Sequence, residues 1–311
     1  MAEKVSQQTI DESAEPRMSA VTGIENISTI LVIGAGTMGR QIAMSAALAG
    51  YSTIIQDISA DGLTAARTEL EGWAASRVAK GKLEQGVADA ALEKLGYSTD
   101  LDTAAATADF VIEAATERLD IKTSIFEKLG VLAPAHAILA TNSSTLGSSK
   151  VADATGRPAQ VCNMHFFNPA LVMKCVEVVR HEATSDSTVE TTMELARRLG
   201  KEPVLINREV PGFIANRLMG AIQREALFLA DQGIASIEDI DTTARTALGH
   251  PMGPFALMDM VGLDVIDFIA QATHAETGAD EDAPNPRVAS LVAEGKLGRK
   301  SGVGFYDYSN Q

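Results

Sequence analysis

Three glycines with the spacing GxGxxG could hold a dinucleotide. They follow the apolar stretch 29–33 in the sequence GAGTMG (34–39), and a helical pattern begins directly after them. The first glycine permits a tight turn, the second lets the backbone approach a pyrophosphate, and the third lets strand and helix pack closely. The first amides of the helix then face the diphosphate at the positive end of the helix dipole. The predicted dinucleotide contacts in this turn are Gly34, Gly36, Thr37, Met38 and Gly39.

Asp57 ends the next apolar stretch, close to the position about 20 residues after the glycines where an acidic residue binds the ribose. A carboxylate there accepts hydrogen bonds from both ribose hydroxyls and repels a 2′-phosphate. No Arg or Lys occupies residues 58–60, so the sequence favours NAD over NADP. The alternative interpretation is an ordinary glycine turn followed by a solvated aspartate.

Four polar features further along the chain could act on a small molecule beside that cofactor. Hydroxyl-bearing residues in TNSSTL (141–146) follow an apolar stretch, which puts them at the ligand-binding carboxyl edge of a sheet. His165 ends another such stretch, Glu177 interrupts the apolar sequence CVEVV (175–179), and Asn216 lies in the first turns of a helix. Each also has a structural explanation, namely turn or cap residues, a core histidine, the exposed face of an edge strand, and a solvated asparagine.

Alternating apolar and amphipathic stretches must position these residues. From residue 27 onward the alternation is typical of βαβ units and predicts a parallel sheet. Segment 61–97 is too long for one crossover and predicts a helical pair, with Trp73 on its apolar face and Arg77, Lys80 and Lys82 on the other. The expected strands are 29–33, 53–56, 110–113, 138–140, 160–164, 174–179 and 204–206. The expected helices are 38–49, 60–80, 87–95, 121–131 and 187–199, followed after Pro211 by 212–232, 236–248, 255–276 and 286–294.

These elements predict two folded domains, as the length of 311 residues also suggests at about 150 residues per domain. Residues 1–25 are polar and acidic and lack the apolar core of a signal peptide, so we expect a disordered extension there. Residues 26–208 predict an α/β domain of the Rossmann type with the helical pair as an insertion. Residues 209–311 predict an all-α domain.

Charge and cysteine content narrow the range of partners. The chain has 26 basic and 41 acidic residues and a net charge of −15, which disfavours nucleic acid and anionic membranes. No apolar run approaches the roughly 20 residues that a membrane-spanning helix needs. Cys162 and Cys175 lie in separate strand-like stretches without metal-site spacing. This pattern favours reduced thiols in a cytoplasmic protein and no bound metal.

The chain resembles the L-3-hydroxyacyl-CoA dehydrogenase family, and within it the bacterial 3-hydroxybutyryl-CoA dehydrogenases. The resemblance runs from residue 27 to residue 308 and depends on many motifs in family order. The first four are GAGTMG (34–39), EAATE (113–117) with Lys122, NSSTL (142–146) and HFFNP (165–169). They are followed by VEV (176–178), PGFIANR (211–217), GHPMGP (249–254) and GRKSGVGFY (298–306).

The resemblance implies NAD-dependent oxidation of the 3-hydroxyl of a short-chain (S)-3-hydroxyacyl-CoA, such as 3-hydroxybutyryl-CoA, and the reverse reduction. It makes His165 the general base, while Glu177 orients the imidazole and stabilises its charged form. It also implies that Ser144 contacts the substrate oxygen and that Asn216 positions substrate and histidine. The cofactor residues that carry over are Asp57, Glu117, Lys122, Ser144, Asn168 and Lys300, and the all-α domain is expected to form a homodimer.

The predicted helical pair departs from the family pattern where coenzyme A binds. Family members carry a serine and lysines there, whereas Ala74 and Gly81 occupy the expected contact positions. The candidate replacements are Ser76, Arg77, Lys80 and Lys82, and a solvated helix face is the competing explanation for each of them.

Other functions are compatible with the same residues. One is the same chemistry on a longer or carboxylated acyl-CoA, and another is oxidation of a free hydroxy acid or sugar acid. A third is an NAD-binding protein without turnover, which His165 and Glu177 together disfavour. The long helical pair favours a CoA ester over a free acid, because a free acid needs no such cradle.

Overall fold

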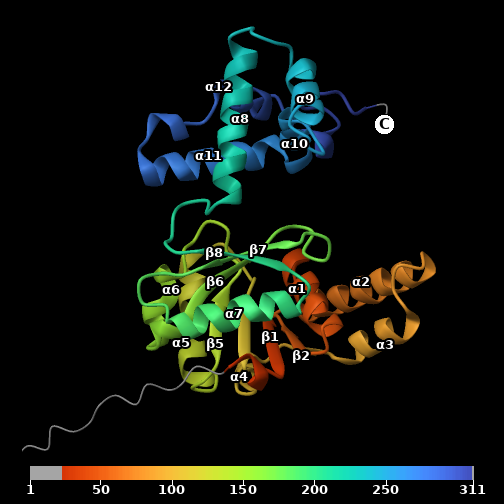
Figure 1. The fold of residues 1–311 in the computed structure, drawn as a ribbon, viewed down its shortest axis with the longest axis vertical. Coiled ribbons are helices and arrows are strands. Elements are labelled where there is room, and N and C mark those ends of the chain that lie inside the picture. Colours follow the sequence, from red (N-terminus) through yellow and green to blue (C-terminus); the bar gives the residue numbers. More distant parts are fainter. Residues whose placement is uncertain (1–22, 310–311) are drawn as a thin grey trace, which may run out of the picture. The chain divides into compact units, whose positions relative to one another are not determined.

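A computed structural model describes residues 23–309, and the chain divides into two units between Glu209 and Val210 (Figure 1). Residues 1–22, which make up most of the predicted disordered extension, lie outside the described residues. The described chain begins with a 3-10 turn, η1 (Ile24–Asn26), directly before the first strand.

The N-terminal unit is built on an eight-stranded sheet with the order β3-β2-β1-β4-β5-β6-β7-β8. Strands β1 to β6 run parallel, and the order reverses direction between β1 and β4. In sheets of this kind ligands bind at the carboxyl ends of the strands, beside such a reversal. The strands are β1 (Thr29–Ile33), β2 (Ser52–Gln56), β3 (Leu95–Ser98), β4 (Phe110–Glu113), β5 (Ile138–Thr141), β6 (Val161–Phe166), β7 (Cys175–Val179) and β8 (Glu202–Ile206).

The sheet is mostly parallel, as predicted, but one strand pair departs from this pattern. β7 pairs antiparallel to β6, and β8 pairs parallel to β7. Residues 167–174 join β6 to β7 without a helix. A parallel crossover needs a dozen or more residues, and this connection is too short for one. The reversal places residues of β6 and β7 directly opposite each other.

Strand β3 was not predicted, because its four residues include a glycine and only two large side chains that could show an apolar pattern. It pairs with β2 at the edge of the sheet, and the preceding helix ends at Glu93 instead of reaching residue 95. The helical pair itself is confirmed. It consists of α2 (Ala60–Ala79) and α3 (Gln85–Glu93), which extend away from the sheet (Figure 1).

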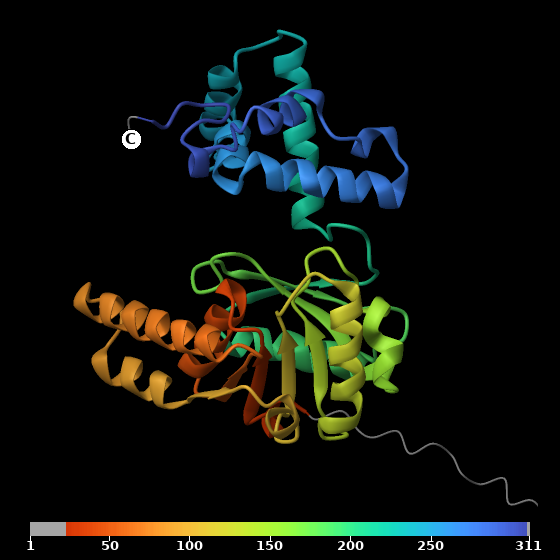
Figure 2. The same ribbon diagram turned by 180° about the vertical axis from the view of Figure 1, so that it is seen from behind.

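Helices cover both faces of the sheet, as Figures 1 and 2 show. Alternate residues of β1 supply the two cores: Ile30 and Val32 face one side, and Leu31 and Ile33 face the other. This period of two is what a central strand buried on both faces requires. The first side is covered by α1 (Thr37–Leu48), α2, α3 and α7 (Asp186–Arg198), and the second by α4 (Leu101–Ala105), α5 (Leu119–Leu132) and α6 (Ser149–Ala152).

The C-terminal unit is helical, as predicted, but the expected helix 255–276 is two helices. Gly262 separates them with φ +106°, a backbone conformation that other residues rarely adopt, so the helical path is broken there. A sequence pattern of apolar residues runs across the break without interruption. The helices are α8 (Ala215–Asp231), α9 (Ile237–Thr246), α10 (Pro254–Val261), α11 (Leu263–Thr277) and α12 (Pro286–Ala293).

Two buried aspartates hold the C-terminal unit together. Asp241 of α9 accepts hydrogen bonds from the backbone amides of Phe255 (2.8 Å) and Ala256 (2.9 Å) in the first turn of α10. Asp259 of α10 accepts hydrogen bonds from the amides of Phe305 and Tyr306, both at 2.9 Å. Because buried carboxylates are costly unless they are paired, the bonds of Asp259 fix residues 305–306 on α10.

Candidate active site

The glycine turn after β1 has the shape that a dinucleotide needs. Gly34 has φ +105°, and an added Cβ would lie 2.6 Å from the carbonyl oxygen of Ala114. A Cβ on Gly39 would lie 1.9 Å from the oxygen of Gly34, so the third glycine lets strand and helix approach. At Gly36 a Cβ would meet nothing within 4 Å, and Gly36 is the N-cap of α1. The turn therefore presents an open cradle beside free helix amides, which fits a pyrophosphate.

The carboxylate of Asp57 is held at the end of β2 beside this turn. Its Oδ2 accepts a hydrogen bond from the amide of Ala35 at 2.7 Å, and its Oδ1 accepts one from the amide of Ser59 at 2.9 Å. Each carboxylate oxygen has a second lone pair, so both can still accept from a ribose diol. The exposed neighbour Ile58 carries no charge that could bind a 2′-phosphate. The position fits NAD.

His165 and Glu177 form a buried pair across the antiparallel strands β6 and β7. The two residues are register partners, and Nδ1 of His165 lies 2.9 Å from Oε2 of Glu177. Their exposed fractions are only 6% and 2%. The ring of Phe167 packs against the imidazole with centroids 4.6 Å apart. Because β8 pairs with the far side of β7, Glu177 does not lie on an exposed sheet edge.

Ser144 lies in the loop after β5, and Glu117 holds that loop. The Oε1 of Glu117 accepts a hydrogen bond from the amide of Ser144 at 3.3 Å, and its Oε2 accepts one from Oγ of Ser143 at 2.5 Å. A further bond ties the loop to β6, where the amide of Phe166 donates to Oδ1 of Asn142 at 2.9 Å. The structure thus joins the loop of Ser144 to the strand of His165.

Lys122 is buried and already paired with protein groups, unlike an exposed lysine that would bind a cofactor directly. Its exposed fraction is 2%, and its Nζ lies 2.5 Å from Oε2 of Glu113 and 3.3 Å from Oγ1 of Thr141. Glu113 is fully buried at the end of β4. The sequence analysis named Glu113 and Thr141 only within their motifs and did not predict that both would contact Lys122. A carboxylate that ends an otherwise apolar strand, with a lysine on the next helix, was the available signal.

Asn168 is exposed in the link between β6 and β7, and the bond from Asn168 to Pro169 is a cis peptide. Asn168 thus lies three residues beyond His165 and carries a polar side chain at the surface.

The helical pair shows which coenzyme A candidates are available. Arg77 does not lie opposite Trp73 as predicted: its guanidinium stacks on the Trp73 ring, 5.5 Å from the centroid. Residues four apart lie on one face of a helix, which is the physical reason. Ala74 is buried in the core and cannot contact a ligand. Ser76, Lys80 and Lys82 are exposed, as is Gly81 in the turn between the helices.

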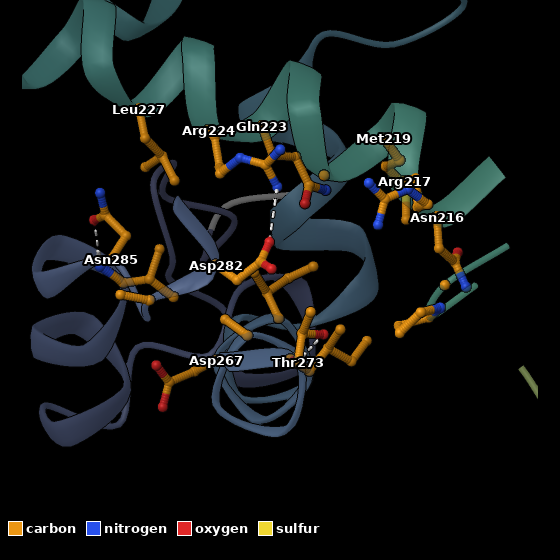
Figure 3. A pocket seen from close by; sticks show the side chains of 18 residues that line it. Asn216, Arg217, Met219, Gln223, Arg224, Leu227, Asp267, Thr273, Asp282 and Asn285 are labelled. Carbon is orange, nitrogen blue, oxygen red and sulfur yellow. Dashed lines mark hydrogen bonds and ion pairs between the residues drawn. The ribbon is translucent and has the colours of Figure 1, made fainter. Parts of the chain in front are cut away.

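Asn216 and Lys300 belong to the C-terminal unit. Asn216 lies in the first turn of α8 and lines a pocket between α8, α11 and α12 (Figure 3). Lys300 lies in the 3-10 turn η5 (Arg299–Ser301), where its Nζ is 2.5 Å from Oδ1 of Asp264. Residues in the pocket wall include Met219, Gln223, Leu227, Ile266, Ala270 and Val288.

Residues 23–309 contain no cluster of three or more His, Cys, Asp or Glu side chains that could hold a metal ion. No helix in that part of the chain is long and apolar enough to span a membrane. Cys162 and Cys175 are both free thiols, and burial raises the pKa of Cys162 to about 12.

Two family models match consecutive parts of the chain. Residues 29–210 match the 3-hydroxyacyl-CoA dehydrogenase NAD binding domain, and residues 212–308 match the 3-hydroxyacyl-CoA dehydrogenase C-terminal domain. The chain belongs to the 3-hydroxyacyl-CoA dehydrogenase family. The resemblance seen in the sequence motifs is therefore confirmed, and so is the Rossmann-type domain followed by a helical domain.

Individual members of the 3-hydroxyacyl-CoA dehydrogenase family are similar over nearly the whole chain. A probable 3-hydroxybutyryl-CoA dehydrogenase of Bacillus subtilis is 39% identical, over 92% of this chain and 99% of its own. A 3-hydroxyadipyl-CoA dehydrogenase of Escherichia coli is 40% identical, over 91% of this chain and 59% of its own. The crystal structure of (S)-3-hydroxybutyryl-CoA dehydrogenase from Ralstonia eutropha superposes with a TM-score of 0.86 at 35% identity, covering 91% of this chain and 100% of that one.

Membership of the 3-hydroxyacyl-CoA dehydrogenase family defines the reaction class. The protein is an NAD-dependent oxidoreductase of 3-hydroxyacyl-CoA thioesters, as predicted. The interpretation as an NAD-binding protein without turnover is thereby set aside.

Proposed function

We propose that this dehydrogenase acts on a short-chain (S)-3-hydroxyacyl-CoA such as 3-hydroxybutyryl-CoA, with His165 as its acid–base residue. The observation that carries the proposal is the buried hydrogen bond of 2.9 Å between His165 and Glu177. Its location supports the assignment, because His165 lies near the carboxyl end of β6 in the NAD-binding sheet, where ligands of such sheets bind.

The role of His165 follows from where the proton of the C3 hydroxyl must go during oxidation. Bound NAD would supply the hydride acceptor for C3, so the C3 hydroxyl must lose a proton to a residue of the protein. The imidazole accepts that proton through Nε2, since Nδ1 faces Glu177, and returns it to the carbonyl oxygen in the reduction. The carboxylate of Glu177 orients the ring and stabilises the imidazolium that forms.

The remaining site residues follow the family pattern. Ser144 contacts the substrate oxygen, Asn216 positions substrate and imidazole, and Asn168 contacts substrate and cofactor. The glycine turn and Asp57 bind the pyrophosphate and the adenosine ribose, and Glu117, Lys122 and Lys300 complete the cofactor set. For Lys122 we propose an indirect contribution, because its Nζ is already engaged by Glu113 and Thr141.

Coenzyme A binding on the helical pair is supported by exposed residues of the right chemistry. Ser76, Lys80 and Lys82 are exposed and could contact the phosphates and hydroxyls of coenzyme A. Arg77 is the weaker candidate, because the Trp73 ring already engages its guanidinium.

A homodimer through the C-terminal unit completes the proposal. Large apolar side chains are exposed on α8 and α11, and exposed apolar surface supports an interaction there. They include Leu218, Ile222 and Phe228 of α8, and Val265, Phe268 and Ile269 of α11. The cytoplasm stays the predicted compartment, and the two free cysteines support it.

A carboxylated acyl group is the second candidate substrate. It is favoured by the similarity to the 3-hydroxyadipyl-CoA dehydrogenase of Escherichia coli, whose named substrate carries a second carboxyl group. The four-carbon substrate is preferred as the first choice because that name recurs among the similar bacterial proteins and structures.

The decisive experiment follows NADH oxidation spectrophotometrically with acetoacetyl-CoA. Free acetoacetate replaces the thioester in one control, and NADPH replaces NADH in another. We expect rapid turnover only with the thioester and NADH. Faster turnover of a 3-oxoadipyl thioester than of acetoacetyl-CoA would reverse the order of the two candidates, and turnover of free acetoacetate would remove the role of coenzyme A.

A further inference from the structure

Asn163 is a fully buried asparagine of β6. Both its amide oxygen and its amide nitrogen form hydrogen bonds with the loop after β5. Its Oδ1 accepts a hydrogen bond from the amide of Ser148 at 2.7 Å. Its Nδ2 donates to the carbonyl oxygens of Leu146 at 3.1 Å and Ser143 at 3.3 Å. The exposed fraction of Asn163 is 0%. One side chain therefore holds three backbone groups of the loop that contains Ser144.

Asn163 and His165 point to the same face of β6. Residues two apart on a strand share a face and lie about 7 Å apart. The intervening Met164, like Cys162, packs in the core on the opposite face, which confirms the alternation. Asn163, which holds the Ser144 loop, and His165, which pairs with Glu177, thus project side by side from the same strand.

The loop depends on these bonds because they satisfy three of its backbone polar groups, one amide and two carbonyl oxygens. Buried backbone groups without a partner cost roughly 1–3 kcal/mol each, and Asn163 is the partner of three such groups. Asn142 and Glu117 hold the loop at other points, through the amides of Phe166 and Ser144. Among the described residues outside the loop, Asn163 is the one whose side chain bonds the loop backbone both before and after Ser144.

We propose that Asn163 is a positioning residue for the dehydrogenase reaction, which sets the Ser144 hydroxyl at its working distance from His165. The proposal rests on the proposed role of Ser144 at the substrate oxygen. Asn163 itself touches neither substrate nor cofactor. Small displacements of a substrate-contacting group are costly, since a shift of about 1 Å can lower the rate by roughly 100-fold.

The test is a double-mutant cycle of N163A and S144A, assayed with acetoacetyl-CoA and NADH. We expect N163A to lower kcat by about 10- to 100-fold in the wild-type background but by only about twofold in the S144A background. The dissociation constant of NADH should stay within about twofold of wild type, because the glycine turn is unchanged. A residue that only supports the fold would give the same factor in both backgrounds.

Gln160 provides a matched control, since it is another buried amide that bonds backbone carbonyls. Its Nε2 donates to the oxygens of Ala135 (2.7 Å) and Ala137 (3.3 Å), away from the Ser144 loop. We expect Q160A to lower the melting temperature as N163A does while leaving kcat within about twofold of wild type. N163D, which keeps the acceptor and the volume but loses both donors, replaces N163A if the alanine variant does not fold.

Three outcomes overturn the proposal: an unchanged kcat in N163A, equal losses of kcat in both backgrounds, or full activity in S144A. Failure of the proposed function is distinguished from these outcomes because the wild-type protein would then not turn over acetoacetyl-CoA at all.

Discussion

At the residue scale, the pairing of His165 with Glu177 explains why a charged residue stands in the middle of a buried strand. An unpaired carboxylate at that depth would be strongly unfavourable, and the imidazole supplies its hydrogen-bond partner at 2.9 Å. The same bond selects the ring nitrogen that faces away from Glu177 for proton transfer. Burial and function therefore require the same two residues.

Replacing His165 with alanine removes the acid–base group and leaves the glycine turn and Asp57 intact. We expect H165A to lower kcat for acetoacetyl-CoA reduction by roughly 10²- to 10⁴-fold, while the dissociation constant of NADH changes by less than about twofold. Steady-state kinetics and NADH fluorescence titration measure the two quantities. Loss of NADH binding would contradict the assigned role.

His136 is the matched control, because it forms the other histidine–carboxylate pair of the unit, with Nε2 3.0 Å from Oδ1 of Asp109. It precedes β5, so it lies at the amino ends of the strands, away from the edge where ligands bind. We expect H136A to keep the wild-type kcat at a temperature where the variant is folded.

At the scale of elements, the strand–turn–helix unit formed by β1 and α1 separates two uses of glycine. Gly39 lets the strand–helix turn pack closely, whereas the space beside Gly36 is open and fits the cofactor pyrophosphate. Substitution by alanine at the two positions therefore tests packing and cofactor binding independently.

For G39A we expect a large loss of stability, about 3 kcal/mol or more, since the added Cβ collides with the backbone oxygen of Gly34. For G36A we expect a melting temperature within a few degrees of wild type, about 2 °C, and NADH binding weakened by roughly 10-fold or more. Thermal melts and NADH titrations of both variants check this. Unchanged NADH affinity in G36A would refute the assignment of the cradle.

Asp109 ties together the amino ends of β1 and β4. It accepts hydrogen bonds from the amides of Ser28 and Thr29, both at 2.9 Å, and pairs with His136. Burial alone would raise the pKa of Asp109, but the hydrogen bonds from His136, Ser28 and Thr29 outweigh it and lower the pKa. The ionised carboxylate therefore stabilises the fold above the unfolded-state pKa of about 3.9, and this contribution is lost as the pH falls through the lower folded-state value.

We expect D109N to lower the free energy of unfolding by about 1–2 kcal/mol at neutral pH, because the amide accepts fewer and weaker hydrogen bonds. The difference from wild type should shrink as the pH falls below about 4, where wild type also loses the charge. Denaturant unfolding of both proteins across this range measures it. A difference that grows on acidification would contradict the sign.

At the scale of the whole molecule, the C-terminal unit carries large apolar side chains that are exposed to solvent. Phe268 of α11 is 71% exposed, and Leu218 of α8 is 62% exposed. A second copy of the chain would remove this surface from water. Burying a phenylalanine is worth about 2–3 kcal/mol, so a single exposed residue such as Phe268 would contribute measurably to association.

We expect F268E to raise the dissociation constant of the dimer by at least about 30-fold. Multi-angle light scattering over a concentration series measures this constant. V131E is the matched control, since Val131 is an exposed apolar residue of α5 in the other unit, and its replacement should leave the dimer unchanged. A wild-type monomer at micromolar concentration would rule out the dimer.

The amino-acid sequence by itself determined those features that are local or repeat with a fixed period. The glycine turn needs only neighbouring residues, and its spacing identified the cofactor class before any fold was known. The strands β1, β4 and β5 and the helices α1, α2 and α8 followed from apolar periodicity, with boundaries within a few residues. The many motifs in order gave the family, and with it the reaction class.

The tertiary structure decided which distant residues meet. The antiparallel entry of β7 places Glu177 opposite His165, the burial of Lys122 directs its charge to Glu113, and Asn163 reaches a loop that precedes it by many residues. The pairing of His165 with Glu177 was expected only from the family resemblance, and the contacts of Lys122 and Asn163 were not predicted. Each arises because strands adjacent in the sheet come from separated parts of the chain, so their partners are chosen by packing and by the need to satisfy buried polar groups.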